Sequence, residues 1–302
     1  MAINRANIAK ELLPGLNAVF GLEYGSVDNE HEPLYVVENS DRAFEEEVLF
    51  TGFATAPTKS EGAAIQYDSA QENYTARYTA ETVALAFAIT EEAMEDNLYD
   101  TFSKVKSRSL ARAMANTKQT KAANVFNNAF STSYLGGDGQ PLISDSHPTI
   151  SDGDQDNDLD TVDLSETNLE TALIAIQKTK DDRGILVGAS AVCLHIDPTN
   201  QFNAERILNS PGRPSSANND INAVNNMGLI PDGYYVNRRF TDTNAFYIKT
   251  DVPNGTKMFV RAPLQTKMEP DFDTGNMRFK ARERYSFGWS DWRGWYGSAG
   301  SS

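Results

Sequence analysis

The segment from Glu91 to Phe130 constrains the fold most, because helical periodicity continues along it for about forty positions. Thr90 is a suitable N-cap, and acidic residues crowd the first turns. From Thr101 onward every charged residue is basic, which suits the dipole at a helix C-terminus. An unbroken helix of this length is about 60 Å long, so the sequence predicts an elongated molecule. Contact with a nucleic acid is the competing interpretation of these basic residues, which are Lys104, Lys106, Arg108, Arg112, Lys118 and Lys121.

Apolar and polar residues alternate before this helix, and this pattern predicts long β-strands. It covers residues 48–53, 74–79 and 83–89, with a polar stretch at 54–71 rich in Gly, Ser, Thr and Pro. We interpret these segments together as one long β-hairpin with a wide tip. Ten residues of strand reach about 30 Å. A two-stranded ribbon is marginally stable alone, so a protruding one needs a partner surface.

The net charge of −15, from 27 basic and 42 acidic residues, argues against a protein that binds duplex nucleic acid. The charge is uneven: residues 138–182 carry 2 bases and 12 acids, whereas 183–302 carry 14 bases and 11 acids. Opposite charges on adjacent segments suit head-to-tail contacts between copies. The acidity can equally serve solubility alone.

The sequence offers little equipment for metal or thiol chemistry. Its single cysteine excludes a disulfide framework, and the three histidines lack metal-ligand spacing. The longest apolar run, 83–89, is too short to cross a membrane, and no leader pattern opens the chain. We therefore expect a soluble intracellular protein that needs no cofactor.

Two weak signals for a chemical site remain. Cys193 and His195 fall on one face of a predicted buried strand, a pairing found in hydrolases, although a buried thiol beside a core histidine is the commoner case. An acidic run resembles part of a calcium loop but lacks its glycine and final glutamate. Its calcium candidates are Asp152, Asp154, Asp156 and Asp158.

The last predicted strand has one apolar and one basic face. Four cations on one strand face repel one another and need carboxylates or phosphates opposite them. Trp289, Trp292 and Trp295 follow at intervals of three, and they either close the core or anchor a subunit contact. Helices and strands mix without a βαβ rhythm, so the predicted class is α+β. The basic face carries Arg278, Lys280, Arg282 and Arg284.

The order of these elements resembles the major capsid proteins of tailed bacteriophages, which have the Hong Kong 97 type fold, and among them the Mu-type major head subunits. The resemblance rests on four short sequence motifs. They are Leu13-Pro-Gly-Leu-Asn17, Gly137-Asp-Gly-Gln-Pro-Leu-Ile-Ser144 with His147-Pro148, Ala204-Glu-Arg-Ile-Leu208, and Asp291-Trp-Arg-Gly294 with Tyr296-Gly297.

This resemblance implies five regions. Residues 1–44 would be an N-terminal arm, whose helical spacing is interrupted at Pro14-Gly15, and 45–90 an extended loop lying over a neighbouring subunit. Residues 91–160 would form a peripheral domain with the spine helix, 161–255 an axial domain, and 256–302 the return strand and tail.

The resemblance also implies the function. Hexamers and pentamers of a major capsid protein, not an enzyme, would form an icosahedral shell around phage double-stranded DNA, without sequence specificity and without a membrane. Scaffold, portal and decoration proteins would be further partners, and assembly would take place in the host cytoplasm. The expected interface residues are Lys59, Tyr74, Arg77, Tyr78, Arg278, Lys280, Arg282, Arg284, Trp292 and Trp295.

Overall fold

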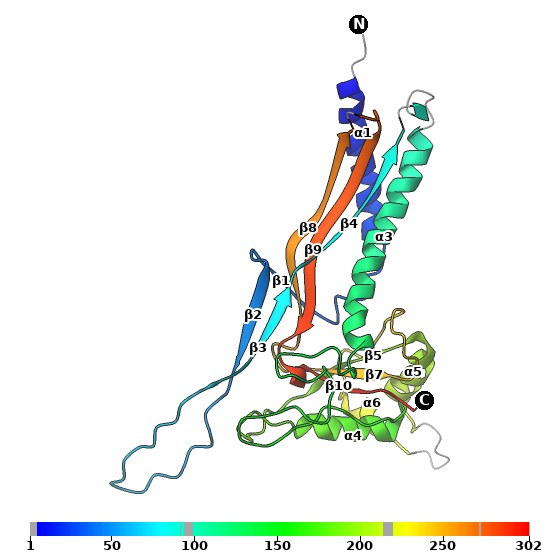
Figure 1. The fold of residues 1–302 in the computed structure, drawn as a ribbon. Helices are drawn as coiled ribbons and strands as arrows, with labels where there is room; N and C mark the ends of the chain where they lie inside the picture. The colour runs from blue at the N-terminus through cyan, green and yellow to red at the C-terminus, as the bar shows by residue number, and fades with distance from the viewer. Residues whose placement is uncertain (1–4, 91, 94–98, 214–219, 272, 302) are drawn as a thin grey trace.

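A computed structural model describes residues 5–90, 92–93, 99–213, 220–271 and 273–301. It shows an elongated arm of sheet and helix above a globular body, with a hairpin loop reaching out to one side (Figure 1). The mixed composition of helix and strand confirms the α+β class. No helix within the described ranges is both long and apolar enough to cross a membrane.

The arm is built on a four-stranded sheet in the order β1-β8-β9-β4. Its centre is the antiparallel pair β8 (Thr256–Pro270) and β9 (Met277–Trp289), flanked by β4 (Glu81–Ile89) and by the parallel strand β1 (Val36–Asn39). Side chains of β9 alternate between buried and exposed from Met277 to Glu283, which confirms the predicted two-faced strand.

Two helices cover the inner face of this sheet. Helix α3 (Tyr99–Asn127) is the predicted long helix, and α1 (Arg5–Gly25) lies beside it (Figure 1). The predicted start of the long helix, at 91 and 94–98, lies outside the described residues. The core between helices and sheet contains Leu16, Phe20, Leu110, Met114 and Phe279.

Glu283 is an acidic residue on the apolar face of β9, and side chains from two helices provide its polar partners. Lys118 of α3 pairs with its carboxylate at 2.9 Å, and the Tyr24 hydroxyl of α1 donates to it at 3.1 Å. Lys118 also donates to the Tyr24 oxygen at 2.6 Å. Burial, followed by the charge of Glu283, raises the pKa of Tyr24. This cluster joins three elements of the arm.

The body contains a second sheet in the order β10-β7-β5-β6. Its strands are β5 (Ala191–Ile196), β6 (Tyr234–Val236), β7 (Phe246–Thr250) and β10 (Trp295–Ser298). The helices that pack with it are α4 (Glu166–Gln177), α5 (Gln201–Asn209) and α6 (Ala223–Met227), and the 3₁₀ turn η1 (Pro198–Asn200) leads into α5.

The hairpin is shorter than the sequence predicted. Strands β2 (Phe44–Phe50) and β3 (Glu72–Thr79) pair as an antiparallel ribbon around the loop 51–71. The third alternating segment, β4, turns away after Ala80 and pairs with β9 from Glu81 to Ile89 instead. Its inward side chains Val83 and Phe87 pack against the core of the arm. Burying these apolar side chains of β4 against the arm stabilises the chain more than continuing a solvent-exposed ribbon would.

One further expectation needs correction. Helix α1 continues through Pro14-Gly15, since the missing N–H of proline removes one helix hydrogen bond while Leu16 and Phe20 are buried beyond it. After β9 the chain passes through the 3₁₀ turn η2 (Trp292–Gly294), and β10 then pairs with β7 in the body sheet.

Candidate assembly surfaces

The loop 51–71 is the most extended surface of the molecule (Figure 1). Mutual hydrogen bonds between Thr51 and Gln71 close its base, with N···O distances of 2.9 and 3.0 Å. Beyond them every described side chain is exposed, including Lys59 and the apolar Phe53 and Ile65. An exposed apolar group on a projecting loop indicates a contact site for another molecule.

One contact ties this loop to the body. The Asp68 carboxylate accepts the backbone N–H groups of Ala54 and Ser69 at 2.7 and 2.9 Å, and these bonds lower its pKa. Arg183 of the body donates to the Ser69 carbonyl at 3.0 Å. The loop therefore leaves the body in a defined direction.

The ribbon base is anchored by polar groups that point inward. The Tyr74 hydroxyl donates to the Ser290 carbonyl at 3.1 Å, and the Tyr78 hydroxyl meets the Ser290 hydroxyl at 2.5 Å. Burial raises the pKa of both tyrosines. Glu47 contacts both Ser290 and Lys257. Burial disfavours the charge of Lys257, but the carboxylates of Glu47 and Glu38 outweigh this effect and raise the pKa of Lys257. Tyr78 is thus buried within its own subunit, whereas Arg77 stays exposed and stacks on Phe44.

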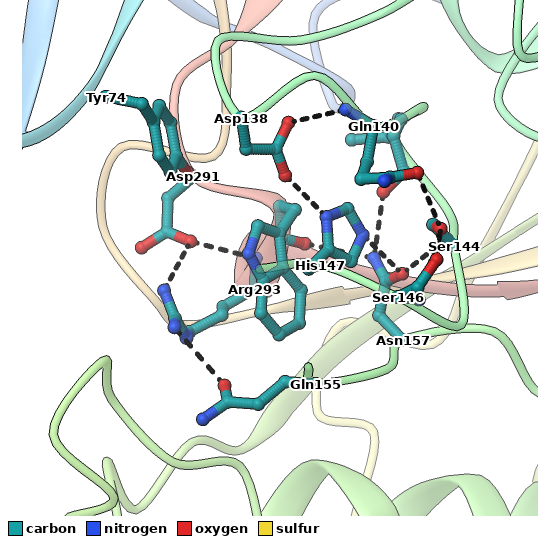
Figure 2. A network of polar contacts seen from close by, with 12 residues as sticks. Tyr74, Asp138, Gln140, Ser144, Ser146, His147, Gln155, Asn157, Asp291 and Arg293 are labelled. Atoms are coloured by element: carbon teal, nitrogen blue, oxygen red, sulfur yellow. Dashed lines mark hydrogen bonds and ion pairs between the residues drawn. The ribbon is translucent and has the colours of Figure 1, made fainter. Parts of the chain in front are cut away.

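A buried polar network lies where the arm, the ribbon and the body meet (Figure 2). His147 stacks on Trp292 with ring centroids 4.3 Å apart, and its Nδ1 lies 2.6 Å from Asp138. The Asn157 side chain donates to the carbonyls of Leu142 and Trp295 at 2.9 and 2.8 Å. These bonds hold in place the long segment between α3 and α4, which has no regular helix or strand.

The same network continues through Arg293. Its guanidinium pairs with Asp291 at 3.4 Å and donates to Gln155 at 3.2 Å (Figure 2). It also pairs with Asp182 at 2.8 Å. Burial disfavours the charge of Arg293, but the carboxylates of Asp291 and Asp182 outweigh it and raise its pKa. Sequence reasoning missed this network, since its members are polar residues scattered over more than a hundred positions with no common spacing.

The outward face of β9 carries the predicted row of basic residues. Arg278 pairs with Asp271 at 2.5 Å, and Lys280 and Arg282 are exposed. Within the described part of the chain, no carboxylate lies at ion-pair distance from Lys280, Arg282 or Arg284. The charge of Lys267 and, more weakly, that of Lys280 lower the pKa of Glu269, so Lys280 is partly compensated. Arg282 and Arg284 are left without an ion-pair partner in the described part of the chain.

The last two tryptophans are core residues, which corrects the expectation that they anchor a subunit contact. Trp292 is 2% exposed and Trp295 0%. Trp295 contacts Phe126 at 4.6 Å between ring centroids and donates to the Thr256 hydroxyl at 3.0 Å. No surface of either ring is free to meet a neighbouring chain.

The acidic run is spread over a turn rather than gathered around one point. Asp152 pairs with Lys180 at 3.2 Å, and burial, aided by Asp160, raises the pKa of Asp156 and Asp158. Among the residues described, including Asp154, no group of three or more His, Cys, Asp or Glu side chains could hold a metal ion.

Cys193 and His195 do meet, at 3.2 Å between Sγ and Nε2. Burial raises the pKa of the Cys193 thiol to about 11 and lowers that of His195 to about 3. The thiol therefore stays protonated beside a neutral imidazole at neutral pH, and a nucleophile requires the thiolate. This arrangement suits a buried pair in the core of β5.

Comparison with known proteins gives one family and a consistent fold. The sequence profile of the phage capsid protein family matches residues 72–298. No curated protein matches the chain. Similar solved structures include the capsid of an empty GTA particle, at 12% identity, TM-score 0.58 and 91% coverage of both chains.

Two other solved structures have the same fold. The procapsid of bacteriophage JBD30 matches at 13% identity with TM-score 0.54, covering 99% of this chain and 77% of the other. A virus-like particle from Pyrococcus furiosus matches at 10% identity with TM-score 0.53, covering 95% and 99%.

Proposed function

This chain belongs to the phage capsid protein family and is a major capsid protein of a tailed-phage shell, and on that premise we propose how its parts serve assembly. Copies associate into hexamers and pentamers that close an icosahedral shell around double-stranded DNA. The chain contributes structure and no catalysis. Many modest contacts made at once stabilise the shell, because multivalency multiplies weak interfaces.

The observation that carries this proposal is the loop 51–71, which projects from the subunit with its apolar side chains exposed. A loop of this kind gains burial only on another molecule. In the proposed arrangement the loop 51–71 and the exposed side of the β2-β3 ribbon lie over a neighbouring subunit, with Lys59 and Arg77 facing it, whereas β4 stays in the sheet of its own subunit. The ribbon base, held by Tyr74 and Tyr78, sets the direction of the loop.

We assign the remaining regions to the roles that the capsid fold gives them. Residues 1–44 form the N-terminal arm, and 91–160 the peripheral domain with its spine helix. Residues 161–255 form the axial domain at the capsomer centre, to which β10 of the segment 256–302 adds a strand. Scaffold, portal and decoration proteins complete the particle in the host cytoplasm, and the acidic chain lets packaged DNA move without sequence-specific contact.

The basic face of β9 is proposed as an electrostatic contact between subunits. Arg282 and Arg284 find no ion-pair partner in the described part of their own chain, so a neighbouring copy with its net negative charge supplies the counter-charges. Lys280 already interacts with Glu269 and contributes less. Arg278 already has Asp271 and contributes less.

A double charge reversal tests this assignment. Arg282→Glu with Arg284→Glu should block particle formation in electron micrographs while circular dichroism stays that of the folded subunit. The matched variant Arg282→Lys with Arg284→Lys keeps the charge and should still form particles. Normal particles from the reversed chain would contradict the assignment.

A further inference from the structure

The segment 26–35 connects α1 to β1, and a buried pair of side-chain contacts attaches it to α3. The segment has no regular helix or strand. Its His31 is 7% exposed, and Gln119 of α3 is 3% exposed. The Gln119 Oε1 accepts the backbone N–H of His31 at 3.0 Å, and the Gln119 Nε2 lies 2.8 Å from the His31 Nδ1. We call this pair of residues the His31 clasp.

The two bonds of the clasp determine which hydrogens each group carries. A backbone N–H can only donate, so the Gln119 carbonyl oxygen must face it and the Gln119 amide nitrogen must face the imidazole. Because that amide nitrogen can only donate as well, the His31 Nδ1 has to accept and carries no proton. His31 is therefore neutral in the closed clasp, with its single ring hydrogen on Nε2.

A protonated His31 cannot keep both bonds. Its Nδ1–H would point at the amide hydrogens of Gln119. Turning the Gln119 amide over would give Nδ1–H an acceptor, but it would set the same amide hydrogens against the His31 backbone N–H. Either arrangement leaves a donor without an acceptor inside the subunit, where an unsatisfied polar group is destabilising.

The charges around His31 act in the same direction. Burial lowers the pKa of His31, and the ammonium group of Lys118 on α3 lowers it further. The carboxylate of Glu32, on the same segment, opposes this effect without outweighing it. Glu283 of β9 and Tyr24 of α1 both bind the Lys118 ammonium group. A proton on His31 would thus bring a second cation into a buried site that already holds one.

Contacts that do not involve His31 anchor the rest of the segment. Glu30 pairs with Arg239 at 2.7 Å, and Leu34 is fully buried. The ring of His31 itself makes an edge-on contact with Phe287 of β9, with 6.4 Å between ring centroids. Loss of the clasp would therefore free the turn around His31 while the end of the segment next to β1 stays attached.

We propose that the His31 clasp is an acid-sensitive attachment between the α1–β1 connection and α3, which is closed while the imidazole is neutral and opens when the imidazole takes up a proton. The clasp lies within a single subunit and does not depend on assembly. It gives the N-terminal arm, residues 1–44, a connection to α3 that loosens in acid.

The direction of the pH dependence follows from the proton content of the two states. The open turn exposes His31, whose ordinary pKa is about 6.5, whereas the closed clasp excludes the proton. The closed state is therefore fully favoured above about pH 6.5 and loses stability as the pH falls below that value. The ratio of open to closed turns should rise by up to about tenfold between pH 7.5 and pH 5.5.

Hydrogen–deuterium exchange of the unassembled subunit, followed by mass spectrometry, tests the clasp. Protection factors, which correct for the intrinsic pH dependence of exchange, are compared at pH 7.5 and pH 5.5 for peptides that cover 26–35. A peptide from α4 reports any loosening of the whole subunit. We expect protection of 26–35 to fall severalfold at pH 5.5, by at most about tenfold, and to fall more than that of α4.

Gln119→Glu is the most specific variant, because a carboxylate accepts both the backbone N–H and an imidazole Nδ1–H. It should keep 26–35 equally protected at both pH values. His31→Asn keeps an acceptor without a titrating ring and should also remove the pH dependence, so it carries the same test if Gln119→Glu fails to fold. Thr120→Glu adds the same charge at an exposed position of α3 and should respond to pH as the native chain does.

Two results would overturn the inference. One is a native chain in which 26–35 is equally protected at both pH values, or loosens only as much as α4. The other is a Gln119→Glu or His31→Asn chain that loosens in acid as the native chain does. Both measurements use the unassembled subunit, so either failure leaves the proposed capsid function standing.

Discussion

Replacing Glu283 by leucine is expected to destabilise the subunit strongly, because it leaves Lys118 inside the arm without its carboxylate. The side chains of Lys118 and Glu283 are 17% and 2% exposed, and Tyr24 loses its acceptor as well. Removing one partner of a buried ion pair costs about 3–5 kcal/mol. Lys118 can turn its ammonium group partly to water, so the cost should lie near the lower limit, at about 3 kcal/mol.

Urea unfolding of the unassembled subunit, followed by circular dichroism, measures this loss. The double variant Lys118→Met with Glu283→Leu removes both charges and should recover to within about 1 kcal/mol of the native chain. The exposed pair of Lys267 and Glu269 is the control, where Lys267→Met should cost at most about 1 kcal/mol. A double variant destabilised by the sum of its two single changes would refute the reasoning.

Further predictions concern the body. Iodoacetamide at pH 8 should leave Cys193 unmodified in the folded subunit and alkylate it after unfolding, since burial raises its pKa to about 11; rapid native alkylation detected by mass spectrometry would contradict this. His195 has a folded pKa lowered by burial to about 3, below its unfolded value, so its contribution to stability is full at neutral pH and falls by roughly 1.4 kcal/mol per pH unit once pH drops below about 6.5. His195→Gln should flatten the curve of unfolding free energy against pH over that window, and an unchanged slope would disprove the burial argument. EDTA should leave the Tm unchanged, because the described part of the acidic run gathers no metal ligands, and a drop of several degrees would restore the calcium hypothesis.

Local patterns predicted the elements of the arm well. The period-2 alternation of β9 and the charge gradient of α3 follow from short-range geometry, and both elements are present. The resemblance to tailed-phage capsid proteins is confirmed by the family match. In each case the signal lies within one continuous segment.

Pairing partners and burial at a distance could not be predicted in the same way. The alternation in β4 shows a strand but cannot show that its partner, β9, lies about two hundred residues further along. Three tryptophans at equal spacing fit a core or an interface equally well, and the surroundings of Trp292 and Trp295 decide for the core. Glu283 is an exception within an apolar face, and only the structure reveals Lys118 and Tyr24 as its partners.

The environments of Tyr285 and of the His147 network depend entirely on tertiary structure. Tyr285 reads as an ordinary inward residue of β9, and only the structure shows that its hydroxyl is buried without a hydrogen-bond partner among the described residues. Asp138, His147 and Asn157 have no motif spacing, and hydrogen bonds to distant backbone give them their role.

Cryo-electron microscopy of the purified chain tests the central claim most directly, namely that the exposed loop 51–71 is buried only by another copy. The account predicts closed icosahedral shells in which the loop of each subunit lies on its neighbour. A chain that remains monomeric at every concentration, with the loop folded back onto its own body, would contradict it.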